Sequence, residues 1–255
     1  MSFSVIIPAR LGSSRLPEKP LKDLGGKPMI QRVYEAASQS DAKQVIVATD
    51  HPRIEQVVKS FGGKACMTKE SHPSGTDRLQ EVVQNLRSAD GDIVVNVQGD
   101  EPLIPPSVIN QVATNLAQHP DMSMATLSEP IASIEDCFNP NIVKVVRSLY
   151  GQALYFSRAP IPWVRDNYDN DSPVLPQSQQ PQRHIGIYAY RVSLLHQFVD
   201  WPVSTLELLE KLEQLRVLEN GHRIHIETAC ELVPGGVDTE EDLHRVAALF
   251  SSQIC

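Results

Sequence analysis

The chain has 255 residues, 41% hydrophobic and 21% charged, which is typical of a globular protein with a sizeable core. Its formal net charge of −8 argues against a nucleic-acid-binding protein, although a local cluster of cations can still bind a small anion. The four cysteines form no C-x-x-C pair, and neither a signal-peptide pattern nor an apolar run of about 18 residues is present. We therefore expect a cytoplasmic protein with no membrane partner and no zinc or disulfide framework.

The first predicted strand is the apolar run 5–7, and the loop after it combines small residues with cations. Arg10, Arg15 and Lys19 flank the segment around Gly12. Ligands bind beyond the carboxyl ends of strands in open α/β sheets, where small residues expose backbone N–H groups and cations neutralise phosphate charge. The loop matches neither the G-x-G-x-x-G nor the Walker pattern. It predicts a polyphosphate site of another kind, with a solvated basic loop as the alternative.

Strand-like and helix-like stretches alternate over the first half of the chain. This order predicts an α/β fold with a mostly parallel sheet flanked by helices on both faces. The predicted helices cover residues 28–40, 52–61, 76–86 and 106–118, and the further strands cover residues 44–49, 65–68 and 92–98.

The second half, from about Met122, predicts a smaller mixed β-rich region. Residues 165–183 are polar and rich in proline, and they predict a long loop, whereas a leucine stripe predicts one helix over 205–219. We expect a single domain, 1–255, with a nucleotide-binding half at about 1–121, a second portion at about 122–230 and a C-terminal motif and helix at 231–255. Predicted strands cover residues 122–128, 141–148, 152–158, 184–190 and 223–228.

Two aspartates are candidate ligands of a cation. Asp100 follows a buried strand in "GDEP", and Asp238 lies in "GGVDTEEDL" between a glycine turn and a predicted helix. One or two carboxylates together with substrate phosphates are the usual environment of Mg²⁺. The alternatives are a turn residue for Asp100 and a helix N-cap for Asp238. A third carboxylate, Asp50, also ends a strand, and we interpret it as the cap of the next helix.

Further polar residues are less distinctive when taken singly. Ser74 and Gly75 precede a predicted helix whose first turn holds Arg78, an unfavourable place for a cation unless it meets a ligand or solvent. A second group could form a site for a polyol carrying a carboxylate, although each member alone favours a structural role. That group consists of Arg158, His184, Tyr188, Glu213 and Gln214.

Seven segments together closely resemble the 3-deoxy-manno-octulosonate cytidylyltransferase family, the CMP-Kdo synthetases. The first segment alone is shared in looser form with many sugar nucleotidyltransferases, whereas the combination is far more specific and spans nearly the whole chain. The segments are "PARLGSSRLPEKPL", "HPSGTDRL", "VQGDEP", "FSRAPIPW", "RHIGIYAYR", "LEKLEQLRVLENG" and "GVDTEEDL".

The resemblance implies a nucleotidyltransferase-type sheet and a Mg²⁺-dependent reaction of CTP with Kdo that gives CMP-Kdo and pyrophosphate. It also implies a cytoplasmic homodimer whose product enters lipopolysaccharide assembly. The implied catalytic residues are Arg10, Arg15, Lys19 and Asp100, and the implied metal ligands are Asp100 and Asp238. The implied nucleotide-binding residues are Ala9, Arg10, Lys19, Ser74, Gly75, Arg78 and Gln98. The implied sugar-acid-binding residues are Gln98, Arg158, His184, Tyr188, Glu213 and Gln214.

Three alternatives stay open at this point. The first is the same chemistry on another acceptor, such as a sialic acid or a sugar 1-phosphate, which would change the motifs of the second half. The second is a glycosyltransferase, although those enzymes commonly carry Asp-x-Asp where this chain has "GDEP". The third is a nucleotide-sensing module without catalysis, which would need the pocket but not both Asp100 and Asp238.

Overall fold

A computed structural model describes residues 2–12 and 16–252. Its strands join in one sheet of nine within these described ranges. In chain order they are β1 (Phe3–Ala9), β2 (Gln44–Thr49), β3 (Ala65–Met67), β4 (Ile93–Asn96), β5 (Met124–Pro130), β6 (Lys144–Arg147), β7 (Ala153–Ser157), β8 (Gln182–Arg191) and β9 (Ile224–Thr228). The polar residues of interest follow β1, β2 and β4, so their positions depend on how these strands are ordered.

The main path of the sheet has the order β3-β2-β1-β4-β8-β5-β9. Strands β1 to β4 are mutually parallel, and β5 is parallel to β9. Strand β8 is antiparallel to both of its neighbours, β4 and β5, so it alone runs against the others on this path. The prediction of a mostly parallel sheet is confirmed, and the carboxyl ends of β1 and β4 lie side by side at one edge.

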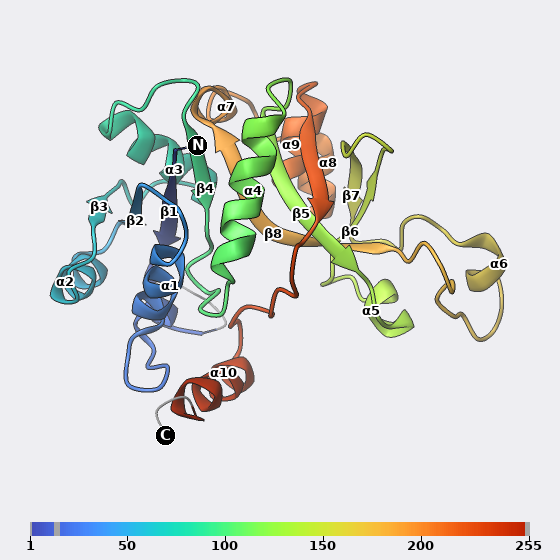
Figure 1. Ribbon diagram of the computed structural model, residues 1–255, viewed down its shortest axis with the longest axis horizontal. Helices are drawn as coiled ribbons and strands as arrows, with labels where there is room; N and C mark the ends of the chain where they lie inside the picture. The colour runs from blue at the N-terminus through green and yellow to red at the C-terminus, as the bar shows by residue number, and fades with distance from the viewer. Residues whose placement is uncertain (1, 13–15, 253–255) are drawn as a thin grey trace.

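Helices cover both faces of the sheet, as predicted. On one face pack α1 (Met29–Ser38), α2 (Pro52–Ser60), α4 (Pro106–Gln118) and α10 (Glu240–Ser252), of which α1 and α4 lie in front of the sheet in Figure 1. On the other face pack α3 (Gly75–Asn85), α7 (Val192–Phe198) and α9 (Gln214–Glu219). The central strand serves both cores, because Val5 and Ile7 face the first and Ile6 faces the second. Short helices complete the chain: η1 (Lys19–Leu21), α5 (Ile134–Phe138), α6 (Arg165–Tyr168) and α8 (Thr205–Glu210).

The prediction of one helix over 205–219 is wrong. Helix α8 ends at Glu210, Lys211 adopts a left-handed conformation with φ 55°, and α9 begins at Gln214. The Arg216 guanidinium donates to both carboxylate oxygens of Glu207 at 2.6 Å. Residues nine positions apart do not meet in a continuous helix, so this bidentate pair accompanies the turn. The leucine stripe did not show this break, because it continues across the turn.

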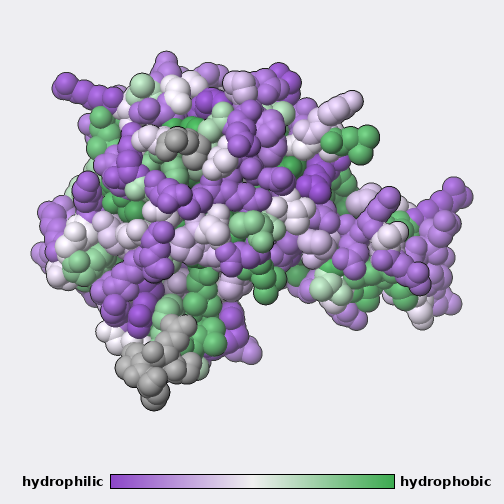
Figure 2. Space-filling model, viewed as in Figure 1, coloured by the Kyte–Doolittle hydropathy of each residue, from purple (hydrophilic) through white to green (hydrophobic). Residues whose placement is uncertain are grey.

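A lobe made of α5, α6, β6 and β7 projects from the body and lies at the right of Figure 1. The predicted loop 165–183 is interrupted at its start by α6 and at its end by β8, which begins at Gln182. Tyr168 of α6 is buried against Cys137 and Ile131 in a small core of the lobe. This contact packs the polar segment around α6 against the rest of the lobe. Figure 2 shows hydrophobic side chains on the lower side of the lobe. Within the described part of the chain, no helix is long and apolar enough to cross a membrane.

Candidate active site

A cavity of about 360 Å³ lies at the sheet edge where β1 and β4 end. The loop after β1, the loop before α3, the loop after β4 and the segment before α10 form its walls. Every described residue that the resemblance assigns to nucleotide or metal lines it, whereas Arg15 lies outside the described residues. Those lining residues are Ala9, Arg10, Lys19, Ser74, Gly75, Arg78, Gln98, Asp100 and Asp238.

The walls of this cavity touch through their main chains. A Cβ atom added at Gly99 would lie 2.8 Å from the carbonyl oxygen of Pro8, and one added at Gly236 would lie 3.0 Å from that of Asp100. The backbone N–H of Val237 also donates to the carbonyl of Asp100 at 2.8 Å. Side chains larger than hydrogen would force these segments apart. The glycines therefore allow Asp100 and Asp238, from distant parts of the sequence, to meet.

The ammonium of Lys19 lies between these two carboxylates. It donates to Asp100 Oδ2 at 2.6 Å, to Asp238 Oδ1 at 2.9 Å and to the carbonyl of Val237 at 3.1 Å. Burial alone would lower the pKa of Lys19, but the two carboxylates outweigh it and raise the pKa above its ordinary value. Lys19 is thus a charged lysine throughout the neutral pH range.

The structure separates Asp238 from the capping of α10. The hydroxyl of Thr239 accepts the backbone N–H of Asp242, which is the bond of an N-cap. Asp242 in turn accepts from the backbone N–H groups of Asp238 and Thr239 at 3.2 Å each. The capping alternative for Asp238 is therefore wrong, and its carboxylate faces the cavity instead.

The donor set fits a hard divalent cation. Asp100 and Asp238 keep 33% and 44% of their side chains exposed, and both already hold one positive charge. Among the described residues there is no group of three or more His, Cys, Asp or Glu side chains that could hold a metal. Two carboxylates on an open cavity suit Mg²⁺, which usually keeps several waters and takes further oxygens from substrate phosphates.

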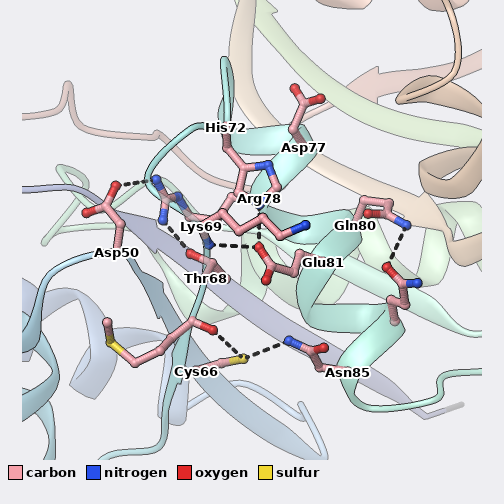
Figure 3. Close-up of polar contacts among 12 residues, drawn as sticks. Asp50, Cys66, Thr68, Lys69, His72, Asp77, Arg78, Gln80, Glu81 and Asn85 are labelled. Carbon is pink, nitrogen blue, oxygen red and sulfur yellow. Dashed lines mark hydrogen bonds and ion pairs between the residues drawn. The ribbon is translucent and has the colours of Figure 1, made fainter.

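Arg78 lines the cavity but is only 4% exposed, so the surface alternative is wrong. Its guanidinium donates to Asp50 Oδ2 at 2.5 Å and to the hydroxyl of Thr68 (Figure 3). Asp50 does not cap α2, because His51 Nδ1 accepts the backbone N–H of Arg53 at 3.2 Å. Asp50, expected to be a cap, is therefore the partly buried ion-pair partner of Arg78, and it compensates this cation in the first turn of α3.

His72 is a cavity residue that the sequence interpretation missed. Its Nε2 contacts Glu81 of α3, and Glu81 also accepts the backbone N–H of Lys69 at 2.9 Å (Figure 3). The loop before α3 is thereby tied to the body of that helix. His72 lies inside the segment "HPSGTDRL". It was not singled out because its contact with Glu81 is not visible in any sequence pattern.

Gln98, one of the sugar-acid candidates, lines the cavity, whereas His184, Tyr188, Glu213 and Gln214 form a cluster outside its wall, behind the start of α3. The hydroxyl of Thr76 donates to Glu213, and burial raises the pKa of that carboxyl above its ordinary value. Gln214 is 5% exposed, and its Nε2 has no hydrogen-bond partner among the described residues. Burial also raises the pKa of Tyr188 far above its ordinary value. Glu213 and Tyr188 are only partly buried, and burial shifts the pKa of each toward retention of its proton.

His184 belongs to the same cluster. Its ring centroid lies 5.3 Å from that of Tyr188 and 4.9 Å from that of Phe156, and its Nε2 lies 2.9 Å from the hydroxyl of Thr126. Burial lowers the pKa of His184 to about 3. The imidazole is therefore neutral near pH 7, so it offers a hydrogen bond rather than a positive charge to a carboxylate.

Two residues differ from the expected arrangement. Arg158 bonds the carbonyls of Glu210 and Pro140, at 2.6 and 2.8 Å, and does not line the cavity. Asn96, which was not singled out, is 3% exposed beside its cross-strand partner Tyr188, and its Oδ1 has no partner within the described ranges. A polar residue at the end of the apolar strand "DIVVNVQ" was the available signal for it.

Comparisons with known proteins show which family the chain belongs to. A family model described as cytidylyltransferase matches residues 4–224. The chain is 66% identical over 251 residues to the 3-deoxy-manno-octulosonate cytidylyltransferase of Cellvibrio japonicus, covering 98% of each chain. It is 62% identical to that of Saccharophagus degradans, covering 99% of this chain and 100% of the relative.

Solved structures extend the comparison to three dimensions. The structure of CMP:2-keto-3-deoxy-manno-octonic acid synthetase complexed with CTP is 43% identical, covers 99% of both chains and has a TM-score of 0.89. A cytidylyltransferase from Leptospira borgpetersenii is 16% identical with a TM-score of 0.62, and it covers 98% of this chain and 87% of its own. The second likeness shows the fold alone.

Proposed function

Because the chain belongs to the 3-deoxy-manno-octulosonate cytidylyltransferase family, we propose that it transfers CMP from CTP to Kdo and releases pyrophosphate. Kdo is the eight-carbon sugar acid 3-deoxy-manno-octulosonate. The observation that carries the proposal is the convergence of Arg10, Lys19, Asp100 and Asp238 on one cavity at the carboxyl edge of the sheet.

The reaction is an in-line displacement at the α-phosphorus. The anomeric oxygen of Kdo forms a bond to phosphorus, the bond to the pyrophosphate oxygen breaks, and the hydroxyl proton leaves to solvent. Such transfers depend on positioning and on neutralising charge. Arg10 and Lys19, together with Arg15, would hold the triphosphate and stabilise the charge that develops on pyrophosphate.

We assign Mg²⁺ to Asp100 and Asp238, whose carboxylates are the open oxygen donors of the cavity. When bound there, it would neutralise phosphate oxygens and favour ionisation of the attacking hydroxyl. Asp100 would thus contribute to catalysis through its charge, and Asp238 would complete the same ligand set.

The nucleoside would lie against the loop before α3. Ser74 caps this helix of eleven residues by accepting the backbone N–H of Asp77 at 3.3 Å, and Gly75 is its first residue. A helix N-terminus favours anions and polar groups. Ala9 ends β1, and Gln98 follows the end of β4. Both line the cavity together with Arg78, whose charge is compensated by Asp50.

The sugar acid would lie between the cavity and the cluster of His184, Tyr188, Glu213 and Gln214. Gln98 lines the cavity, and Glu213 reaches the start of α3 through Thr76. Amide, carboxyl and phenol groups suit the hydroxyls of an octulosonate, and a guanidinium suits its carboxylate. The full proposed set is Gln98, Arg158, His184, Tyr188, Glu213 and Gln214, and Arg158 would have to exchange its carbonyl partners for substrate.

Assembly and location are part of the proposal. We expect one catalytic domain, a homodimer and a cytoplasmic role in supplying activated Kdo for lipopolysaccharide. The projecting lobe supports a homodimer, because it exposes Phe138, Trp163 and Val174, which are 39%, 52% and 54% exposed. Large apolar side chains gathered on a projection are typical of contact surfaces.

The test is pyrophosphate release from CTP and Mg²⁺ with Kdo, compared with a sialic acid, a sugar 1-phosphate and no acceptor. Release with Kdo alone would support the proposal. Release with another acceptor would keep the nucleotide and metal assignments and overturn those of the sugar-acid cluster. Folded protein that binds CTP but releases no pyrophosphate with any acceptor would favour a sensing module.

A further inference from the structure

Lys19 fills the space between the two carboxylates that we assign to the metal. An ammonium carries three protons, and its three acceptors are Asp100 Oδ2, Asp238 Oδ1 and the carbonyl of Val237. Its side chain is only 15% exposed. The cavity thus already holds a cation with a full set of oxygen partners.

A divalent metal and this ammonium compete for the same oxygens. Mg²⁺ requires carboxylate oxygens at about 2.0–2.1 Å, and it repels a positive charge a few ångströms away strongly. The two carboxylates together carry two negative charges, which the lysine and the metal would exceed. Without a further anion, the arrangement favours one cation between Asp100 and Asp238 over two.

Lys19 can leave this position without moving its backbone. Its own N–H donates to the carbonyl of Leu16 at 3.2 Å, and its carbonyl accepts the N–H of Lys22 at 3.2 Å, so η1 is held by main-chain bonds. The four-carbon side chain is flexible. Arg10 and Gly12 line the same cavity, so a triphosphate bound there would offer the ammonium new acceptors.

We propose that Lys19 is a resident counter-ion that keeps divalent metal away from Asp100 and Asp238 until a triphosphate binds. This inference rests on the proposed function. As phosphate oxygens enter, the ammonium turns to them and both carboxylates become available to the metal. Nucleotide and metal therefore raise each other's affinity by the same factor, as linkage requires.

The experiment measures Mn²⁺ binding to the nucleotide-free protein by calorimetry and by the electron paramagnetic resonance signal of free Mn²⁺. We expect Lys19→Met to bind Mn²⁺ at least about tenfold more tightly than the wild type, which corresponds to roughly 1.4 kcal/mol. Lys22→Met is the matched control, because it removes the same charge from an exposed pair with Glu240 at 3.2 Å. Its Mn²⁺ affinity should stay close to that of the wild type.

The double variant Lys19→Met/Asp238→Asn should lose the gain, which assigns it to these carboxylates. If Lys19→Met does not fold, Lys19→Gln removes the charge and keeps an amide donor for the same oxygens. Equal Mn²⁺ affinity in the wild type and the lysine variant would overturn the inference, and Kdo-dependent pyrophosphate release by the wild type would then leave the proposed function intact. An equal gain in Lys22→Met would also overturn it, because general electrostatics would account for the effect.

Discussion

The cavity at the end of β1 and the cluster behind α3 differ in how they carry charge. In the cavity, the Lys19 ammonium bonds the partly exposed carboxylates of both Asp100 and Asp238. In the cluster, Glu213 and His184 are partly buried, and burial shifts the pKa of each toward its neutral form. The first region is suited to a highly charged ligand that brings counter-ions, and the second to hydroxyl groups recognised by hydrogen bonds.

This difference matters because the two regions are neighbours. Thr76, in the first turn of α3, donates to Glu213, while Ser74 and Gly75 just before it line the cavity. A ligand that bridges the two regions would present phosphates to one and a polyol to the other. Substitutions should therefore separate the two regions, with turnover and metal binding affected in the cavity and acceptor affinity and pH response affected in the cluster.

Asp100→Asn should have the largest effect on activity. We expect kcat to fall by roughly 10³-fold, with a much smaller change in CTP affinity, because the carboxylate acts on charge that develops during transfer. Steady-state pyrophosphate release and CTP calorimetry measure the two quantities. Asp90→Asn, an exposed aspartate before the start of β4, is the control. Equal losses of kcat and CTP affinity would contradict the assignment.

Arg78→Met tests the boundary between the regions. It removes the cation and leaves the Asp50 carboxylate, whose side chain is only 12% exposed, without this partner, so we expect the free energy of unfolding to fall by about 3 kcal/mol. Urea denaturation measures the loss. The double variant Asp50→Asn/Arg78→Met should recover much of it, since no uncompensated charge is left. A full loss in the double variant would show that packing, rather than charge, dominates.

His184→Gln tests whether the cluster is neutral. Because the pKa of His184 is about 3 in the folded protein and about 6.5 when unfolded, the unfolded chain binds the extra proton between these values. Stability from this residue is complete above pH 6.5 and is lost as the pH falls toward 3, by up to roughly 1.4 kcal/mol per pH unit. Urea denaturation should show a flatter pH dependence in the variant. Replacing exposed His244 should leave the slope unchanged.

Thr239→Ala should have the smallest effect on stability, and it tests whether the cap of α10 helps to hold Asp238 in the cavity. Loss of this cap should cost about 1 kcal/mol. Metal affinity should also fall, because the residue before the cap is Asp238. Ser133→Ala removes the comparable cap of α5, whose hydroxyl accepts the N–H of Asp136 at 3.0 Å. It should cost similar stability without changing Mn²⁺ binding. Identical binding in both variants would separate α10 from the metal site.

The sequence predicted the cavity well because its residues follow strand ends. In a parallel sheet these ends share one edge, so Arg10 and Asp100 had to be neighbours once β1 and β4 were recognised. The position of the cluster behind α3 was harder to predict. Glu213 reaches its place because the chain turns at Lys211, and the leucine pattern continued across that turn.

Partner choice among charged groups was the other limit. The strand ends predicted that Lys19 and Asp100 share one region, and the family resemblance added Asp238, but neither gave a sign that the lysine would lie between the carboxylates. Similarly, Asp50 and Arg78 are far apart in the chain, and their pairing depends on how α3 packs beside β2. Such pairs are decided by a few ångströms of tertiary packing, which local patterns do not encode.

The close approach of main chains at Gly99 and Gly236 has a practical consequence for redesign. The spacing between Asp100 and Asp238 is determined by main-chain segments in contact, not by side-chain length. The preference for one acceptor over another, in contrast, would depend on side chains of the cluster behind α3, such as Tyr188. An engineer could therefore exchange cluster residues in search of new acceptors while Asp100 and Asp238 keep their positions. Alanine at either glycine, in contrast, would displace these carboxylates and affect every acceptor alike.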